Sequence, residues 1–222
     1  VIPYKNIMNE KTETSQDSTE TQDNIGQRVD PILEHLDVGD AEVDKELIRK
    51  KFIDIWEYDD AEKLNNEEQF MTTVACFIYN AHNVLDDANV RIDRARTMIV
   101  SALAGWKQTE RDKMIEQEKA SENPFKAFIE NHQPQVDAVY TWENFLLEHK
   151  TVSDKNWVYK MKQCWFAQYF IRFGRTDYIQ TACAFDKIPW EARKDYVDLK
   201  LSNLFAQLGA VCQFDYKPAK DK

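Results

Sequence analysis

Residues 141–174 read TWENFLLEHKTVSDKNWVYKMKQCWFAQYFIRFG, and in this stretch the pattern of the chain changes from helical to strand-like. TWENFLLEHK and NWVYKMKQC have the composition of strands and are separated by TVSDK, which predicts a hairpin with a longer loop. WFAQYFIRFG then reads as a short aromatic helix that ends at Gly174. Residues 197–217 alternate around Gly209, which predicts a closing antiparallel pair of strands.

The chain before this stretch has the periodicity of helices. Apolar residues recur at helical spacing over about 40–58, 67–85 and 86–106, and a polar helical extension follows. Pro124 suits the first turn of a further short helix. Helices first and antiparallel strands later indicate an α+β fold, in which a helical N-terminal half packs on a C-terminal antiparallel sheet.

The first forty residues differ in composition from the rest. Residues 9–30 are rich in Thr, Ser, Glu, Asp and Gln, so burial offers little to offset the entropy of ordering them. We expect residues 1–39 to form a flexible or draped acidic arm. Residues 40–222 should form a single α+β domain, with helices at 40–132 and mainly strands plus the aromatic helix at 134–217.

Composition excludes several classes of protein. The formal net charge is -10, which argues against a nucleic-acid partner because phosphate binding calls for a clustered basic face. Neither an apolar run of membrane-spanning length nor a secretory signal is visible, so we expect a cytoplasmic protein without a membrane partner. Five glycines and no phosphate-binding motif leave no nucleotide site, and we expect no organic cofactor.

Three of the four cysteines lie in the C-terminal third: Cys164, Cys183 and Cys212. None belongs to a C-x-x-C pair, and small buried packing groups are the common fate of such residues. Cys164 directly precedes the aromatic helix, whose N–H groups would favour a thiolate there. Asp186 could act as a general base if burial raises its pKa, the alternative being a turn carboxylate ahead of Pro189.

The order KQCWFAQYF, then ACAFD, then a strand and a glycine turn that ends in CQFDY resembles the L-2-amino-thiazoline-4-carboxylic acid hydrolase family. The matching positions are Cys164 with Phe166, Cys183 with Asp186, and Gly209 with Cys212 and Phe214. The similarity covers roughly residues 90–216. It implies a compact α+β fold and, in named members, opening of a sulfur- and nitrogen-containing heterocycle by water.

Other residues are also candidates for catalysis or metal binding. Glu143, on the predicted strand with Glu148 and His149, is a candidate for acid–base catalysis beside Cys164 and Asp186. His82 and Asp86 lie four residues apart on a predicted helix, a spacing that a divalent metal can use, but without a second His we predict no metal site.

Aromatic residues crowd the region around the predicted hairpin and helix, and we expect part of this cluster to line a flat, apolar ligand pocket. The residues expected to bind substrate are Trp142, Tyr159, Trp165, Phe166, Tyr169, Cys183 and Cys212.

Together these features predict a small-molecule enzyme that needs no cofactor. The reaction expected is hydrolysis of a C–N or C–S bond in a heterocycle, or a related cyclisation or isomerisation in specialised metabolism. The alternative is a non-catalytic small-molecule-binding or adaptor module. A homodimer through the helical half is compatible with the sequence.

Overall fold

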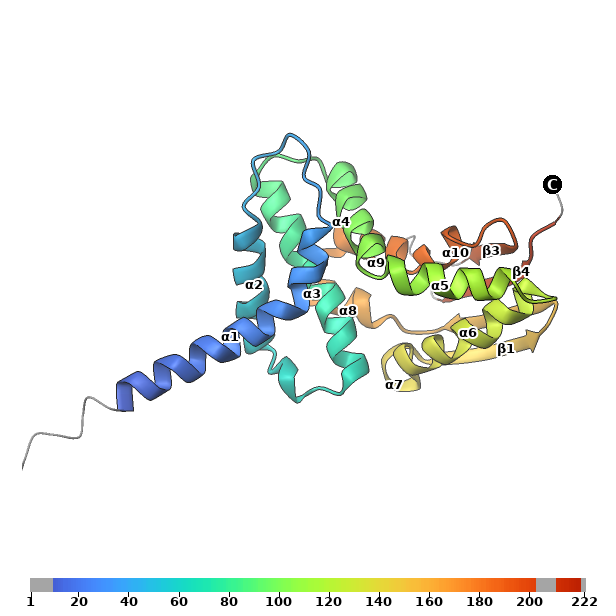
Figure 1. Ribbon diagram of the computed structural model, residues 1–222, viewed down its shortest axis with the longest axis horizontal. Helices are drawn as coiled ribbons and strands as arrows, with labels where there is room; N and C mark the ends of the chain where they lie inside the picture. The colour runs from blue at the N-terminus through green and yellow to red at the C-terminus, as the bar shows by residue number, and fades with distance from the viewer. Residues whose placement is uncertain (1–9, 203–210, 221–222) are drawn as a thin grey trace, which may run out of the picture.

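The computed structural model describes residues 10–202 and 211–220, with side chains for residues 22–141, 143–202 and 211–220. A helical body lies beside a four-stranded sheet, and α5 (Gln108–Lys119) and α6 (Pro124–Val139) extend from the body along the sheet (Figure 1). The predicted α+β arrangement, with N-terminal helices and a C-terminal antiparallel sheet, is confirmed.

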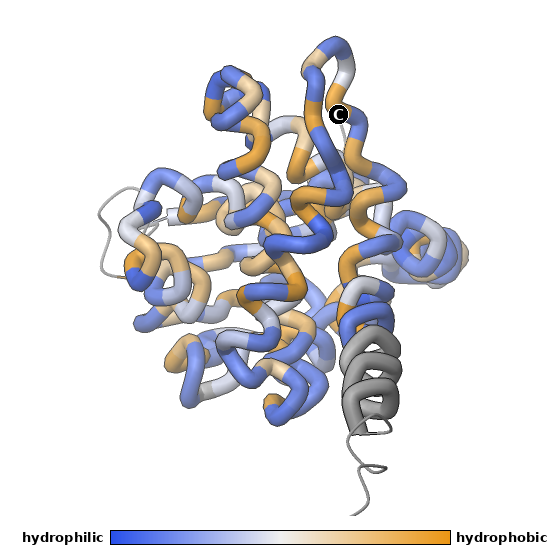
Figure 2. The backbone as a smooth tube through the Cα atoms, turned by 90° about the vertical axis from the view of Figure 1, so that its left-hand side faces the viewer, coloured by the Kyte–Doolittle hydropathy of each residue, from blue (hydrophilic) through white to orange (hydrophobic). Residues whose placement is uncertain are grey.

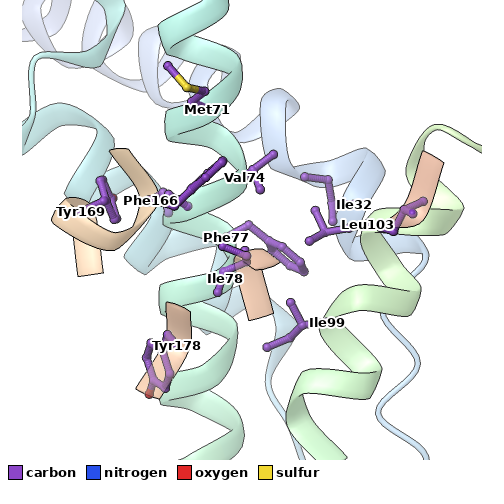
Figure 3. Packing of buried hydrophobic residues seen from close by; sticks show 14 of the residues in the cluster. Ile32, Met71, Val74, Phe77, Ile78, Ile99, Leu103, Phe166, Tyr169 and Tyr178 are labelled. Atoms are coloured by element: carbon purple, nitrogen blue, oxygen red, sulfur yellow. The ribbon is translucent and has the colours of Figure 1, made fainter. Parts of the chain in front are cut away.

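The helical body is built around α3 (Asn66–Asp87). The helices packed against it are α1 (Glu10–Glu34), α2 (Lys45–Tyr58) and α4 (Ile92–Trp106), with a short 3-10 turn at Ala61–Lys63. Residues 71–78 of α3 are all buried, as expected of a helix with neighbours on every side. Figure 3 shows its Val74 and Phe77 among Ile32 of α1 and Ile99 of α4. Burying each such side chain stabilises the fold by roughly 1.5–3 kcal/mol.

Side-chain caps set where α2 and α3 begin. The Asp44 carboxylate accepts a hydrogen bond from the Glu46 N–H at 2.9 Å, and Asn65 accepts one from the Glu68 N–H at 2.8 Å. Each cap satisfies a backbone donor that has no partner inside the helix. The sequence pattern placed the start of the first of these helices at about residue 40, whereas its cap is Asp44.

Helix α1 lies within the segment expected to be an arm. Its second half carries an apolar stripe that includes Ile25, Val29 and Ile32, all buried in the main core. A 25-residue helix occupies most of the segment that was expected to form a flexible or draped arm, and its second half lies on the helical body. Hydrophobic and hydrophilic residues alternate along the helices in Figure 2, as they do where one face packs inward.

The sheet has the strand order β1-β2-β4-β3, and every neighbouring pair is antiparallel. Its strands are β1 (Leu147–Ser153), β2 (Asn156–Met161), β3 (Val197–Ser202) and β4 (Cys212–Pro218). Alternate residues of β2 and β4 are buried, and they pair across the strands as Trp157 with Tyr216, Tyr159 with Phe214 and Met161 with Cys212. Phe128 of α6 packs on this face, 5.4 Å between ring centroids from Tyr216.

The predicted hairpin exists but has different limits. A short helix, α7 (Trp142–Phe145), occupies the first part of the predicted strand, and β1 begins only at Leu147. Strand β1 extends into TVSDK as far as Ser153, and β2 begins directly after it at Asn156, so the turn between Ser153 and Asn156 is only two residues long. The hydroxyl of Ser153 accepts the Asn156 N–H at 3.1 Å, which closes this turn.

Short helices connect the two sheet halves. These are α8 (Trp165–Arg172), a 3-10 turn (Thr176–Tyr178), α9 (Ile179–Phe185) and α10 (Ile188–Glu191). Gly174 follows α8 with a φ of +70°, and the Arg175 N–H bonds to the Phe170 carbonyl at 2.9 Å. This is the helix end that the glycine predicted. Within the described residues no helix is both long enough and apolar enough to cross a membrane.

Candidate active site

The residues singled out by their order in the sequence come together at the sheet end of the helical body. Cys164 directly precedes α8, Cys183 lies on α9, Asp186 follows α9, and Cys212 begins β4. Burial raises the pKa of the Cys164 thiol, and Asp186, Cys183 and Cys212 lie close enough to raise it further. Gly209, the remaining motif position, lies outside the described residues.

Asp186 is the acidic group of this cluster. Burial raises the pKa of its carboxyl to about 6, while a hydrogen bond from Tyr140 and the charge of Lys187 act in the opposite direction. The Tyr140 hydroxyl donates to Oδ1 of Asp186 at 2.6 Å. A carboxyl group with a pKa near 6 can both take up and release a proton close to neutral pH, which is what general acid–base catalysis requires.

Tyr140 holds this carboxylate in place from the end of α6. Burial, together with the nearby charge of Asp186, raises the pKa of the Tyr140 hydroxyl well above its usual value. It therefore keeps its proton and remains a hydrogen-bond donor to Asp186. The ring also packs edge-on against Phe145 of α7 at 4.8 Å, which restricts its rotation.

Cys164 does not have the thiolate that its position suggested. Its sulfur is the cap of α8 and accepts the Ala167 N–H at 3.4 Å, so the expected helix end is present. Burial nevertheless has the larger effect and raises the pKa of the Cys164 thiol. The group is a protonated thiol at neutral pH, and the expectation of a helix-stabilised thiolate is not met.

The sheet supplies an aromatic wall to the cluster. Tyr159 and Tyr216 share a side-chain hydrogen bond; burial raises the pKa of both hydroxyls, and the nearby charge of Asp186 raises it further. The rings of Tyr159 and Phe214 stack at 4.7 Å. Tyr159 is thus near Asp186, and its role in substrate binding stays a prediction. The sequence singled out neither Tyr216 nor Tyr140; the alternation Cys212, Phe214, Tyr216 could have revealed the first, whereas no local pattern marks the second.

The aromatic residues of α8 divide between two places. Phe166 points toward Phe145 and Phe185, at 6.1 and 6.5 Å between centroids, and so belongs to the wall beside Asp186. Trp165 and Tyr169 instead line a separate hollow with Asp59 and Arg172. Trp165 and Tyr169 therefore do not lie beside Asp186.

Glu143 lies on α7 and not on a strand, and its side chain is exposed. Its backbone carbonyl accepts a hydrogen bond from the Gln163 amide at 3.4 Å, which ties α7 to the residue before Cys164. The Trp142 side chain lies outside the described residues. His149, the predicted partner of Glu143, bonds to Asp137 at 2.6 Å and to the Trp157 indole at 3.2 Å.

His82 is a packing residue in this fold. Its Nε2 lies 2.7 Å from the Thr181 hydroxyl, and its ring stacks on Tyr178 at 4.2 Å. Burial lowers the pKa of His82 to about 3, so the ring is neutral. No cluster of three metal-binding side chains occurs in the part of the chain that the structure describes.

A cavity of about 440 Å³ adjoins this cluster on the helical side, between α4, α5, α6 and the α9–α10 segment. Phe185, the residue before Asp186, and Ile188 belong to its lining, whereas Asp186 and Cys164 do not. Its polar residues include Arg111, His132 and Arg193, none of which the sequence singled out. They lie far apart along the chain, and only the packing of α5 and α6 against α10 brings them together.

These features define an α+β protein with a partly buried proton-exchanging carboxyl among thiols and aromatic rings. The family model described as L-2-amino-thiazoline-4-carboxylic acid hydrolase matches residues 69–216, more than half of the chain. The chain belongs to this family, and the resemblance seen in the sequence is confirmed. No curated protein matches the chain.

Two solved structures show a distant likeness. The crystal structure of the Fe(II) unliganded H-NOX protein from K. algicida is 11% identical, with a TM-score of 0.38, covering 88% of this chain and 97% of that one. A mutant of the same protein is 9% identical, with a TM-score of 0.35, covering 79% of this chain and 96% of that one. These TM-scores are too low to carry an argument about fold or function.

Proposed function

We propose that this protein is a hydrolase that opens a C–N or C–S bond of a heterocyclic small molecule, with Asp186 as the group that moves the proton. The observation that carries the proposal is the pKa of Asp186, raised to about 6 by burial at the point where the family's motif residues meet. Cys183, Cys212 and the aromatic wall would form the surroundings of the substrate.

In the proposed reaction, the ionised Asp186 takes a proton from water as the water oxygen bonds to the ring carbon. The C–N or C–S bond then breaks, and Asp186 returns the proton to the leaving nitrogen or sulfur. Tyr140 keeps the carboxylate aimed at the substrate through its 2.6 Å hydrogen bond. Proton transfer by a positioned group contributes about 10²–10⁴-fold to such rates. This scheme needs no thiolate, in agreement with the raised pKa of Cys164.

The test is turnover by the purified protein, followed by mass spectrometry of the released molecules. The panel contains L-2-amino-thiazoline-4-carboxylic acid and other small heterocycles, and a hydrolysed product is heavier by one water. We expect Asp186→Asn to reduce turnover about 10²–10⁴-fold. Asp198→Asn is the matched control, because Asp198 is exposed on β3, and it should retain wild-type turnover. Full turnover by Asp186→Asn would remove Asp186 from the mechanism.

The pH dependence adds a second readout. If Asp186 acts as a base, kcat/KM rises with pH through about 6 as the carboxyl ionises. The hydrogen bond from Tyr140 lowers the pKa of Asp186, so Tyr140→Phe should move this rise to higher pH. Tyr58→Phe, at a tyrosine that is 83% exposed, is the control and should leave the profile unchanged.

A second candidate function is a mass-neutral cyclisation or isomerisation at the same site. The protonated Cys164 thiol favours chemistry by proton transfer alone, and such chemistry does not require water as a reactant. A product of unchanged mass but different retention would support this reaction over hydrolysis. A ligand that binds and is returned unchanged would support the non-catalytic binding module. The homodimer through the helical half stays a prediction.

A further inference from the structure

One wall of the cavity beside the active-site cluster is lined by cationic side chains. Lys107, Arg111 and Arg193 line it, and Glu110 is the single acid among its lining residues. The whole chain carries a net charge of -10, so this local excess of positive charge runs against the composition of the protein. Neutral His132 adds no charge, because burial and the nearby Arg193 lower its pKa to about 4.

Arg111 is held with part of its hydrogen-bonding capacity unused. One terminal N–H donates to the Ala104 carbonyl at 2.8 Å, whereas the Nε atom is buried and has no partner. Burial lowers the pKa of Arg111, and the positive charge of Arg193 lowers it further. A buried guanidinium donor without a partner is unfavourable, and an anion beside the Arg111 guanidinium would offset part of this cost.

Arg193 gives this wall a fixed geometry. Its guanidinium is 2% exposed and makes two bonds to Glu118, at 2.6 and 2.9 Å, and a third to the Pro189 carbonyl at 2.9 Å. Asn131 and Tyr196 also bond to the Glu118 carboxylate. Because Glu118 compensates Arg193, the remaining charges of the wall are the positive charges of Arg111 and Lys107 and the single negative charge of Glu110.

The rest of the cavity is apolar. Its hydrophobic lining consists of Phe70, Leu103, Met114, Phe185, Ile188 and Pro189. The volume of about 440 Å³ lies within the range of roughly 300–1,000 Å³ that small-molecule sites occupy. A bulky apolar body therefore fits against one wall while a negative group meets the other.

We propose that this cavity is a second ligand site, separate from the Asp186 cluster, which binds an amphipathic organic anion: a bulky aromatic or alicyclic body with one acidic group. The acidic group meets Arg111 and Lys107, and the body lies against Phe70, Leu103 and Phe185. This site stands apart from the proposed hydrolysis, because it uses neither Asp186 nor Cys164.

The test compares two probes that share the same rings. 8-Anilinonaphthalene-1-sulfonate is anionic, and N-phenyl-1-naphthylamine is its neutral counterpart. Fluorescence titration of the folded protein should show one sulfonate bound per chain. Arg111→Met should weaken the sulfonate about tenfold or more and leave the neutral probe nearly unchanged.

Two further variants test whether sulfonate binding depends on the charges that line the cavity and not on the net charge of the protein. Glu110→Gln removes the acid of the lining and should tighten sulfonate binding about two- to fivefold. Lys113→Met removes a positive charge from an exposed position of the same helix, and it should leave both probes unaffected. Equal binding of the two probes with no response to Arg111→Met or Glu110→Gln would overturn the proposal, and so would the absence of a single saturable site. Neither result bears on hydrolysis at Asp186, which the turnover assay tests separately.

Discussion

At Asp186, the environment that suits proton transfer also lowers the stability of the fold. Its pKa is raised because burial disfavours the charged carboxylate, although Tyr140 and Lys187 partly offset this. The same environment that makes the group useful for proton transfer near neutral pH makes its ionised form costly to the fold. Side chains whose pKa is shifted by an unfavourable environment are typical of functional sites.

The stability of the Asp186→Asn variant should therefore depend on pH in a defined way. The folded pKa is about 6 and the reference value is 3.8, so the folded state keeps its proton longer, and wild-type stability falls as pH rises through this window. Above it, Asn avoids the cost of the buried charge, and the variant should be more stable than the wild type by about 1–3 kcal/mol. Urea unfolding at pH 4 and pH 7.5 measures the difference, which should nearly vanish at pH 4. An equal difference at both values would contradict the raised pKa.

At the scale of single elements, the end of α8 depends on one backbone conformation. Gly174 has a φ of +70°, and a Cβ added there would meet nothing within 4 Å. A substitution at this position thus changes only the backbone preference and not the packing. The change in stability on substituting Gly174 therefore measures how much its left-handed backbone conformation contributes.

Gly174→Ala should lower the free energy of unfolding by about 1 kcal/mol, since a Cβ disfavours the left-handed conformation. Gly174→Asn should cost less, because Asn adopts this conformation more readily. Urea denaturation of the three proteins gives the comparison. If the two substitutions had equal effects on stability, the conformation of residue 174 would not be the cause.

The elements also show what the sequence could and could not reveal. The helices α2 and α3 were predicted because each has a continuous apolar stripe, and the last two strands because residues 197–217 alternate around Gly209. Helix α1 was missed because the apolar residues in its sequence begin only at Ile25, after a polar first half that dominated the composition. The convergence of Cys164 and Asp186 followed from the family's motif order, whereas the bond from Tyr140 spans 46 residues and has no local signature.

At the scale of the whole molecule, one buried ion pair joins the two halves of the chain. Glu118 on α5 and Arg193 after α10 are 75 residues apart, and their side chains are 0% and 2% exposed. The pair, with Tyr196 and Asn131, holds α5 and α6 against the segment that leads into β3. Such a pair is invisible to a local reading of sequence, because neither residue lies in a pattern that marks it.

Glu118→Gln should destabilise the protein by about 3–5 kcal/mol, because it leaves the Arg193 cation buried without its counter-charge. The exposed pair of Lys126 and Glu130, 3.7 Å apart, is the control, and Glu130→Gln should cost less than about 1 kcal/mol. Thermal or urea unfolding at pH 7 measures both. A cost for Glu118→Gln as small as that of the control would show that the pair does not join the halves.

The bulge in β1 bears on how copies of this protein behave toward one another. Strand β1 is an edge of the sheet, and its register shifts between His149 and Thr151, so Lys150 has no partner residue on β2. An unbroken edge strand offers its free backbone groups to the edge of another molecule and so promotes aggregation. A bulge that carries an exposed lysine distorts the row of free backbone groups and places a charge beside it. The irregularity at Lys150 therefore favours separate, well-dispersed molecules at high concentration.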